Sequence, residues 1–170
     1  MRRKTQLQKD RFIDILEENK GVMYKVAHVY TRDAEDLKDL IQEIVIQLWI
    51  AFEKYDPTYK VSTWMYRIAL NVAISYYRKS SNRKKYISPI ETSIVESSEH
   101  MDHDLHDNIQ TLKALIDGLG ELNRALMILY LEGYDHKEIG DILQLSKSNV
   151  GTKINRIKKH LRKQFKQLES

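Results

Sequence analysis

Residues 135–161 place the strongest constraint on the fold, because they predict two short helices joined by a tight turn. Asp135 is a suitable N-cap for the first helix, and Glu138, three residues later, has the spacing of a capping box. The turn falls at residues 144–145, and Ser146 is a suitable N-cap for the second helix. We therefore predict a helix-turn-helix, a motif whose second helix lies in the major groove of DNA.

The second predicted helix has one apolar and one basic side. The apolar residues that recur at helical spacing are Val150, Ile154, Ile157 and Leu161. The polar residues that point roughly the opposite way are Ser148, Thr152, Asn155, Arg156, Lys159 and Lys163. Residues 147–166 contain eight Lys or Arg and no Asp or Glu. A helical hairpin with a solvated basic face is the alternative, but exposed helices usually mix both signs, so attraction to phosphate explains this helix better. In the first helix, Gly140 stands where a side chain would keep the two helices apart.

Composition excludes several classes of protein. The 170 residues suit one ordinary domain or two small ones, and 42% hydrophobic residues can form a core in each. Two prolines, six glycines and few β-branched runs predict an all-α fold. The chain has no cysteine, which excludes disulfides and thiolate metal sites and fits a reducing cytosol. Neither a signal peptide nor an apolar run of about 20 residues is evident, so we expect a cytoplasmic protein.

Charge is segregated along the chain, although the net charge is only +4. Residues 78–85 carry five basic groups and no acidic one, whereas residues 86–121 carry a net charge of −7. Helical periodicity fades in the serine-rich, acidic stretch between them and the helix-turn-helix. The predicted segments are a helical domain at residues 1–85, a flexible acidic linker at residues 86–104, and a helix-turn-helix domain at residues 105–170. Two basic patches on two modules indicate two contacts with nucleic acid.

The N-terminal domain is expected to begin with two helices. Residues 11–29 show helical periodicity, and Gly21 leaves open whether they form one helix or two. Asp33 is expected to cap a long second helix, with Asp36 at the fourth position of a capping box. The apolar stripe of that helix is Leu37, Leu40, Ile41, Ile44, Val45, Leu48, Trp49 and Phe52. Taken alone, the charged side opposite this stripe indicates only a solvated surface.

A third helix is expected at residues 64–80, after a turn that contains Pro57 and a cap at Ser62 or Thr63. It is apolar nearly all round, so it is either the centre of a bundle or lies against a partner. The side chains on one edge are Trp64, Arg67, Asn71 and Arg78. Such groups stack on and hydrogen-bond unpaired bases. An alternative of equal weight is a tryptophan that packs in the core beside polar surface residues.

Three motifs in a fixed order carry a resemblance to a known family over nearly the whole chain. They are residues 36–49, with Gln42-Glu43; residues 62–71, with Arg78; and residues 122–134, followed by the helix-turn-helix. In this order, with an acidic linker between the second and the third, they resemble the bacterial RNA polymerase sigma factors of the extracytoplasmic-function (ECF) group, in the sigma-70 family. The long pore-lining regions of housekeeping sigma factors are absent, which points to the ECF group.

The resemblance implies an alternative sigma factor, which binds core RNA polymerase and directs promoter-specific initiation. The N-terminal domain would bind polymerase and recognise and melt the −10 element, and the C-terminal domain would read the −35 duplex. The residues implied in polymerase binding are Asp36, Asp39, Gln42 and Glu43. Those implied in −10 binding, including capture of a flipped base, are Tyr55, Tyr59, Trp64, Arg67, Asn71, Arg78, Lys79, Arg83, Lys84 and Lys85. Those implied in −35 binding are Lys147, Ser148, Thr152, Lys153, Asn155, Arg156 and Lys159.

The implied partners are the β′ clamp helices and β flap of core RNA polymerase, promoter DNA and an anti-sigma factor. The acidic linker would lie in the basic RNA-exit path of the polymerase. We expect neither enzymatic activity nor a cofactor or metal, because no nucleophile–base pair, phosphate-binding glycine loop or specific metal motif is present. The family usually has glycine where Gln144 stands, so this chain is predicted to place a non-glycine residue at positive φ.

Two other functions are compatible with parts of the pattern. A stand-alone helix-turn-helix regulator with an N-terminal helical sensor or dimerisation domain would bind paired half-sites without polymerase. An all-helical interaction adaptor that does not bind DNA would leave the purely basic charge of residues 147–166 without a function. The order of the three motifs favours the sigma factor over both.

Overall fold

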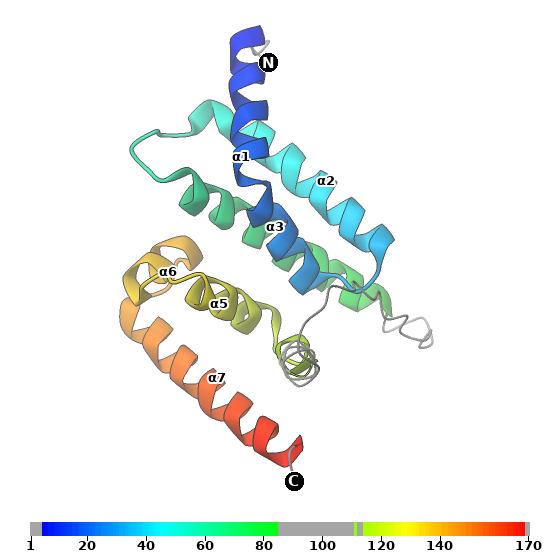
Figure 1. The fold of residues 1–170 in the computed structure, drawn as a ribbon, viewed down its shortest axis with the longest axis vertical. Coiled ribbons are helices and arrows are strands. Elements are labelled where there is room, and N and C mark those ends of the chain that lie inside the picture. Colours follow the sequence, from blue (N-terminus) through cyan, green and yellow to red (C-terminus); the bar gives the residue numbers. More distant parts are fainter. Residues whose placement is uncertain (1–4, 85–110, 112–113, 169–170) are drawn as a thin grey trace, which may run out of the picture. The chain divides into compact units, whose positions relative to one another are not determined.

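The computed structural model describes residues 5–84, 111 and 114–168, and every regular element in that part of the chain is a helix. The chain divides into two compact units, Met1–Pro89 and Ile90–Ser170. The N-terminal unit contains α1 (Gln6–Tyr30), α2 (Ala34–Ala51), the short 3-10 helix η1 (Phe52–Lys54) and α3 (Val61–Lys84); the C-terminal unit contains α5 (Glu121–Leu131), α6 (His136–Leu143) and α7 (Lys147–Leu168) (Figure 1). The predicted all-α fold with two helical domains is confirmed, and residues 86–104 lie outside the described residues.

Helix α1 consists of two helical segments joined by a kink at Asn19, two residues before Gly21. Asn19 leaves the helical region at φ −120° and ψ 17°. Its side-chain Nδ2 donates to the carbonyl oxygen of Ile15 at 3.0 Å, so that carbonyl keeps a partner. An added Cβ at Gly21 would meet nothing within 4 Å. The non-helical backbone is therefore at the asparagine, and no close approach of another side chain or backbone requires the glycine.

Helix α2 starts at the predicted cap and buries the predicted stripe. The Oδ1 of Asp33 accepts the backbone N–H of Asp36 at 2.8 Å. Leu40, Ile44 and Leu48 follow at intervals of four residues and are fully buried. The regular spacing places one apolar side of α2 against its neighbours, and the opposite side faces out.

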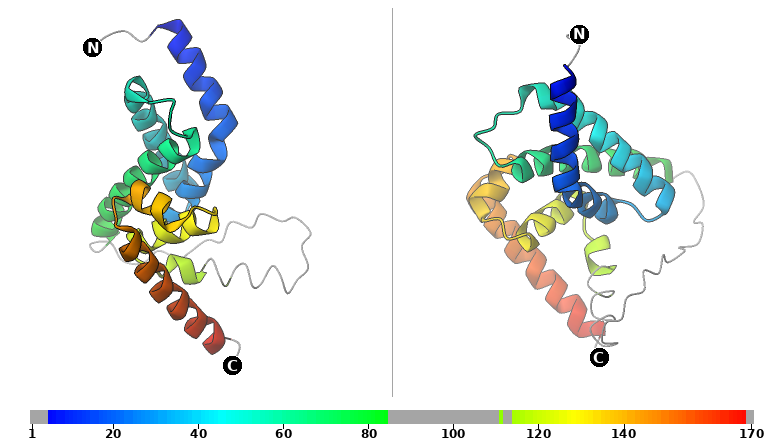
Figure 2. Two further views of the ribbon diagram at one scale, coloured as in Figure 1. Left: turned by 90° about the vertical axis from the view of Figure 1, so that its left-hand side faces the viewer. Right: turned by 45° about the horizontal axis from the view of Figure 1, so that its top comes forward.

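Helix α3 is the centre of the N-terminal bundle, which decides between the two expected alternatives. It packs against both α1 and α2, and α2 and α3 lie side by side while α1 crosses them (Figures 1 and 2). The predicted start at residue 64 is wrong by one turn: α3 begins at Val61, and the backbone N–H of Trp64 already donates to the Lys60 carbonyl at 3.1 Å. Ser62 and Thr63 therefore lie inside the first turn rather than at the cap.

The predicted helix-turn-helix is formed by α6 and α7. The capping box is confirmed, because Asp135 Oδ1 accepts the N–H of Glu138 at 2.9 Å and Glu138 Oε2 accepts the N–H of Asp135 at 2.9 Å. Ser146 Oγ accepts the N–H of Asn149 at 3.2 Å at the start of α7. Between the helices, Gln144 adopts φ 59° and ψ 44°, so the predicted positive φ at a non-glycine residue is also confirmed.

Gly140 allows the turn to fold back onto α6. Its carbonyl accepts the N–H groups of Gln144 and of Leu145, the latter at 2.9 Å. A Cβ added at Gly140 would lie 2.5 Å from the carbonyl oxygen of Leu145. The predicted need for a missing side chain is confirmed, and the obstacle is the backbone of the turn.

Arg124 of α5 is a buried cation that the sequence pattern did not single out. It is 3% exposed, and its Nε donates to the Leu119 carbonyl at 2.9 Å while a terminal nitrogen donates to the Asp117 carbonyl. Carbonyl oxygens therefore satisfy the guanidinium and hold the segment before α5 in place. Helix α5 packs against α7 in the same unit (Figure 2).

Candidate nucleic-acid and protein interfaces

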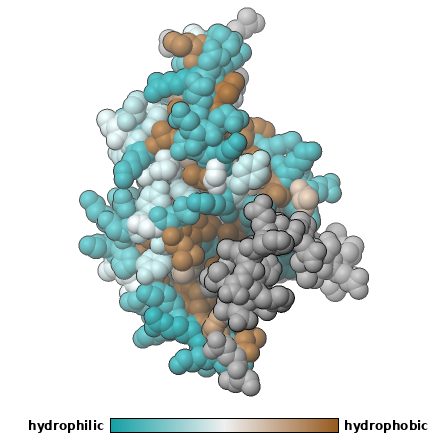
Figure 3. Space-filling model, viewed as in Figure 1, coloured by the Kyte–Doolittle hydropathy of each residue, from teal (hydrophilic) through white to brown (hydrophobic). Residues whose placement is uncertain are grey.

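The outer side of α7 is a basic and polar surface. Val150, Ile154, Ile157 and Leu161 are buried, as predicted. Of the residues predicted to contact the −35 element, those that are exposed are Lys147, Ser148, Thr152, Asn155, Arg156 and Lys159. Lys153 is half-buried. Figure 3 shows hydrophilic side chains along the outer edge of α7 and hydrophobic ones on its side toward α5. This surface can hydrogen-bond base edges and attract phosphates.

One of the eight basic residues of α7, Lys158, is half-buried and contacts α5. The Nζ of Lys158 donates to the hydroxyl of Tyr130 in α5 at 3.2 Å and lies 5.2 Å from the centre of its ring. A cation over an aromatic face is attracted by the ring electrons. Lys158 therefore links α7 to α5, and the basic surface that faces outward is smaller than the count of charges suggests.

Trp64 and Tyr55 pack against each other in an aromatic cluster. Their ring centres are 4.8 Å apart, and the ring of Phe52 lies 6.2 Å from that of Trp64. Trp64 is half-buried. These contacts support the alternative in which this tryptophan stabilises the bundle, since its ring already contacts two aromatic side chains.

Tyr59 is the most exposed aromatic residue of the turn before α3, with 64% of its surface accessible. The Tyr55 hydroxyl donates to the Tyr59 carbonyl at 2.9 Å. Asp56 Oδ1 accepts the N–H of Thr58 at 2.9 Å, and this bond lowers the pKa of Asp56. The turn is thus held by its own side chains, and the ring of Tyr59 projects from it.

The polar edge predicted on α3 lies on the surface. Arg67, Asn71 and Arg78 are exposed and follow at spacings of four and seven residues, which places them on one side of the helix. Arg83 and Lys84 belong to the last turn of α3, but their side chains are not among those described, and Lys85 lies outside the described residues. The described part of this edge can run along a nucleic-acid strand for about three turns.

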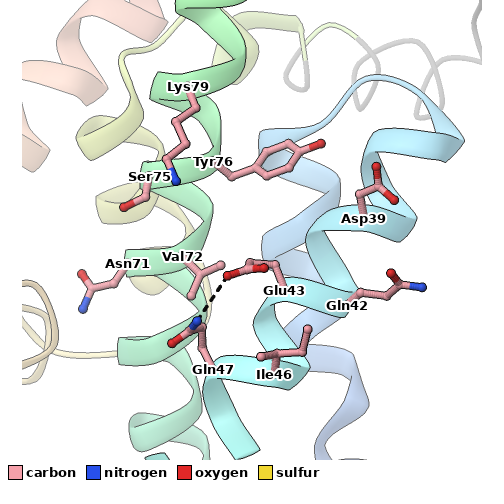
Figure 4. Close-up of a pocket in the computed structure, with 10 residues that line it drawn as sticks. All are labelled: Asp39, Gln42, Glu43, Ile46, Gln47, Asn71, Val72, Ser75, Tyr76 and Lys79. Atoms are coloured by element: carbon pink, nitrogen blue, oxygen red, sulfur yellow. Dashed lines mark hydrogen bonds between the residues drawn. The ribbon is translucent and has the colours of Figure 1, made fainter. Parts of the chain in front are cut away.

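A groove between α2 and α3 brings together residues from two of the predicted sets. The residues that line it are Asp39, Gln42, Glu43, Ile46, Gln47, Asn71, Val72, Ser75, Tyr76 and Lys79 (Figure 4). Asp39, Gln42 and Glu43, predicted to bind polymerase, are exposed on the α2 side. Asn71 and Lys79, predicted to bind the −10 element, form part of the α3 side. Within α2, Gln47 Nε2 donates to Glu43 Oε1 at 3.2 Å.

Asp36 is engaged with α3. The Tyr76 hydroxyl donates to Asp36 Oδ1 at 3.0 Å, and Asp36 is half-buried. Burial, the hydrogen bond to Asp36 and the negative charges of Asp36, Asp39 and Asp33 raise the pKa of Tyr76 to about 12. Tyr76 therefore stays neutral and anchors the first turn of α2 to α3. The family resemblance implied Asp36 in polymerase binding, and the sequence did not indicate this bond, because Tyr76 lies 40 residues away.

Two further features are absent from the described residues. No group of three His, Cys, Asp or Glu side chains there could hold a metal ion. Likewise, none of the helices described is both long and apolar enough to cross a membrane.

The chain is similar to known proteins over most of its length. The family model "Sigma-70 region 2" matches residues 15–83, and the model "Sigma-70, region 4" matches residues 109–161. The ECF RNA polymerase sigma factor SigW of Bacillus subtilis is 27% identical over 94% of this chain and 91% of its own length. SigX of the same organism is 28% identical over 86% of this chain and 79% of its own.

A solved structure has the same fold. The sigma factor RpoE from Bartonella quintana, in complex with the anti-sigma factor NepR, superimposes with a TM-score of 0.72. That comparison covers 95% of this chain and 98% of the other, at 17% sequence identity. The two family matches fall on the two helical units.

Proposed function

Because the chain belongs to the sigma-70 family, in its ECF group, it is an alternative sigma factor of transcription initiation, and we propose how its two units divide this work. The N-terminal unit, residues 1–85, binds core RNA polymerase and opens the −10 element. The C-terminal unit, residues 105–170, binds the −35 duplex, and the linker at residues 86–104 joins them. The protein acts in the cytoplasm.

The observation that carries the proposal for the C-terminal unit is the two-sided character of α7. Its apolar residues are buried, and its outer polar residues are exposed on one side of a helix that follows a capped turn. In this proposal the exposed Asn155 and Arg156 hydrogen-bond base edges, whereas Lys147 and Lys159 attract phosphates. Lys153, being half-buried, contributes its charge from the edge of this surface.

The proposed polymerase contact is the acidic and amide side of α2. Asp39, Gln42 and Glu43 face out, so they can meet basic and polar groups of the β′ clamp helices. Asp36, the fourth residue of this set, serves mainly to orient that side through its bond to Tyr76. The β flap is the proposed contact of the C-terminal unit.

The proposed −10 contact combines the exposed edge of α3 with the turn before it. Arg67, Asn71 and Arg78 follow one strand of the DNA, and Tyr59 supplies an accessible ring on which a flipped base can stack. Stacking of about 1–3 kcal/mol per base largely offsets the cost of unstacking, which is a few kcal/mol. Trp64 stabilises the turn that carries Tyr59 by packing against Tyr55.

An anti-sigma factor is the proposed regulator. The support is that RpoE, which shares this fold, was solved in complex with the anti-sigma factor NepR. A protein that covers the α2 side or the groove beside it would compete directly with polymerase.

The test is size-exclusion chromatography of the full chain mixed with bacterial core RNA polymerase. We expect a co-eluting complex that initiates transcription from a cognate promoter. Glu43→Lys reverses a charge on the proposed contact and should abolish co-elution, with the helical circular dichroism unchanged. Failure to bind polymerase, together with a dimer that shifts duplex DNA by itself, would instead support the stand-alone regulator.

A further inference from the structure

The exposed side of α2 changes from charged to apolar along its length. Asp39 and Glu43 are followed by Ile46 and Ile50, at spacings of four, three and four residues. Ile46 is 50% exposed and Ile50 is 57% exposed. At about 100° and about 1.5 Å per residue, the four side chains lie within an arc of about 60° and extend over about 17 Å of helix. They form a continuous strip with carboxylates at one end and isoleucines at the other.

The strip borders the groove between α2 and α3. Figure 4 shows Asp39, Glu43 and Ile46 following one another along α2, with Val72 of α3 across from them. Ile46 and Val72 give the groove an apolar part, and the charged part lies toward Asp39. This arrangement suits an amphipathic helix laid along the groove, a common mode of recognition.

We propose that Ile46 and Ile50 form the apolar half of the polymerase-docking surface. The surface receives a helix of core polymerase that presents basic residues to Asp39 and Glu43, and apolar residues to the two isoleucines. The inference rests on the proposed function, because the carboxylate half of the strip is the contact assigned to polymerase there. It adds residues that the charge pattern alone did not indicate.

The charges and apolar side chains of the strip favour a polymerase helix over DNA or a second copy of the chain. DNA is disfavoured, because the carboxylates would repel its phosphates and the isoleucines would make no favourable contact with its charged backbone. A second copy of the chain also fits poorly. A parallel copy would place carboxylate on carboxylate, and an antiparallel copy would bury the carboxylates against isoleucines without a partner. A partner helix with one basic and one apolar end satisfies both halves at once.

The experiment measures the affinity of the full chain for core polymerase at several salt concentrations. Ile46→Gln and Ile50→Gln should each weaken binding by about five- to tenfold, because each removes a side chain that is half-exposed in the free protein and buried in the complex. The dependence on salt should stay as in the wild type, since no charge is changed. Glu43→Gln should weaken binding and also flatten the salt dependence.

The matched control is Ile13→Gln, which changes an isoleucine of α1 that is 54% exposed and is not one of the four residues of the strip. It should bind polymerase like the wild type. Normal binding by the Ile46 and Ile50 variants, or an equal loss in Ile13→Gln, would overturn the inference, while loss of binding in Glu43→Lys would leave the proposed function standing. A wild-type chain that does not bind core polymerase would overturn both.

Discussion

Replacing Gly140 with alanine tests the geometry on which the helix-turn-helix depends. The new Cβ would lie 2.5 Å from the Leu145 carbonyl oxygen, whereas ordinary contact begins at 3.4 Å. The turn would therefore have to move by about 0.9 Å, the difference between these two distances. The obstacle is backbone, and it cannot rotate away as a side chain can. The same turn also depends on the bond from the Leu145 N–H to the Gly140 carbonyl.

The expected loss of stability follows from two opposing effects. Overpacking at a site that cannot relax costs about 3 kcal/mol, and alanine recovers about 1 kcal/mol over glycine in a helix. Gly140→Ala should therefore lower the free energy of unfolding of the C-terminal unit by about 2 kcal/mol. Promoter binding by the reconstituted polymerase complex should weaken as well, because α7 would be displaced relative to α6.

The assay is urea unfolding of the full chain, followed by two signals. Both tryptophans, Trp49 and Trp64, lie in the N-terminal unit, so their fluorescence reports that unit alone. Far-UV circular dichroism reports the helices of both units. Gly140→Ala should shift the dichroism transition toward lower urea and leave the fluorescence transition unchanged.

Gly151→Ala is the control within the same motif. Its Cβ would approach His136 Nδ1 to 3.2 Å, but an imidazole can rotate aside, so we expect stability equal to or slightly above that of the wild type. The reasoning is refuted if Gly140→Ala is as stable as Gly151→Ala and binds promoter normally.

Four further perturbations test other parts of the structure. Gln144→Gly should stabilise the C-terminal unit by up to about 1 kcal/mol, because glycine adopts positive φ without strain; urea unfolding measures this. The Tyr76 pKa, raised to about 12 from 10.0, means that the folded state keeps a proton which the unfolded state loses between these values. Stability should therefore fall as the pH rises from about 10 to about 12, and Tyr76→Phe should lack this part of the fall. Trp64→Ala should destabilise the N-terminal unit by about 2–3 kcal/mol through lost aromatic packing, measured by thermal unfolding. Arg156→Ala should lose about 1–3 kcal/mol at a cognate −35 element and relax specificity at one base pair, measured with a panel of promoter variants.

Each of these four predictions has an outcome that would contradict it. Lower stability in Gln144→Gly would mean that the glutamine side chain contributes more than its backbone strain costs. Parallel pH curves for the wild type and Tyr76→Phe would mean that folding does not raise the pKa of Tyr76. A stable Trp64→Ala variant that fails only in strand opening, seen by permanganate reactivity of unpaired thymines, would return this residue to the base-capturing set. Unchanged promoter choice would remove Arg156 from the residues that read bases.

Local rules were sufficient for much of this protein. The cap at Asp135 and the apolar stripe of α7 each depend on residues near one another in the sequence, whereas the positive φ of Gln144 was expected from the family resemblance. Helical periodicity decides which side of a helix is buried, whatever packs against it. For that reason the all-α fold, the helix-turn-helix and the buried and exposed sides of α7 followed from the order of the amino acids.

The tertiary structure decided which side chains on those surfaces have partners inside the protein. The bond between Asp36 and Tyr76 spans 40 residues, and the bond between Lys158 and Tyr130 spans 28. Helical periodicity does not predict such pairs, because they depend on how two separate helices pack and on which long side chains then reach one another. The sequence does not show whether a charged side chain is exposed to an external partner or bonded to another helix of the same protein. The packing of the helices separates the two cases: Lys158 is half-buried against the Tyr130 ring, whereas Asp39 and Glu43 face outward.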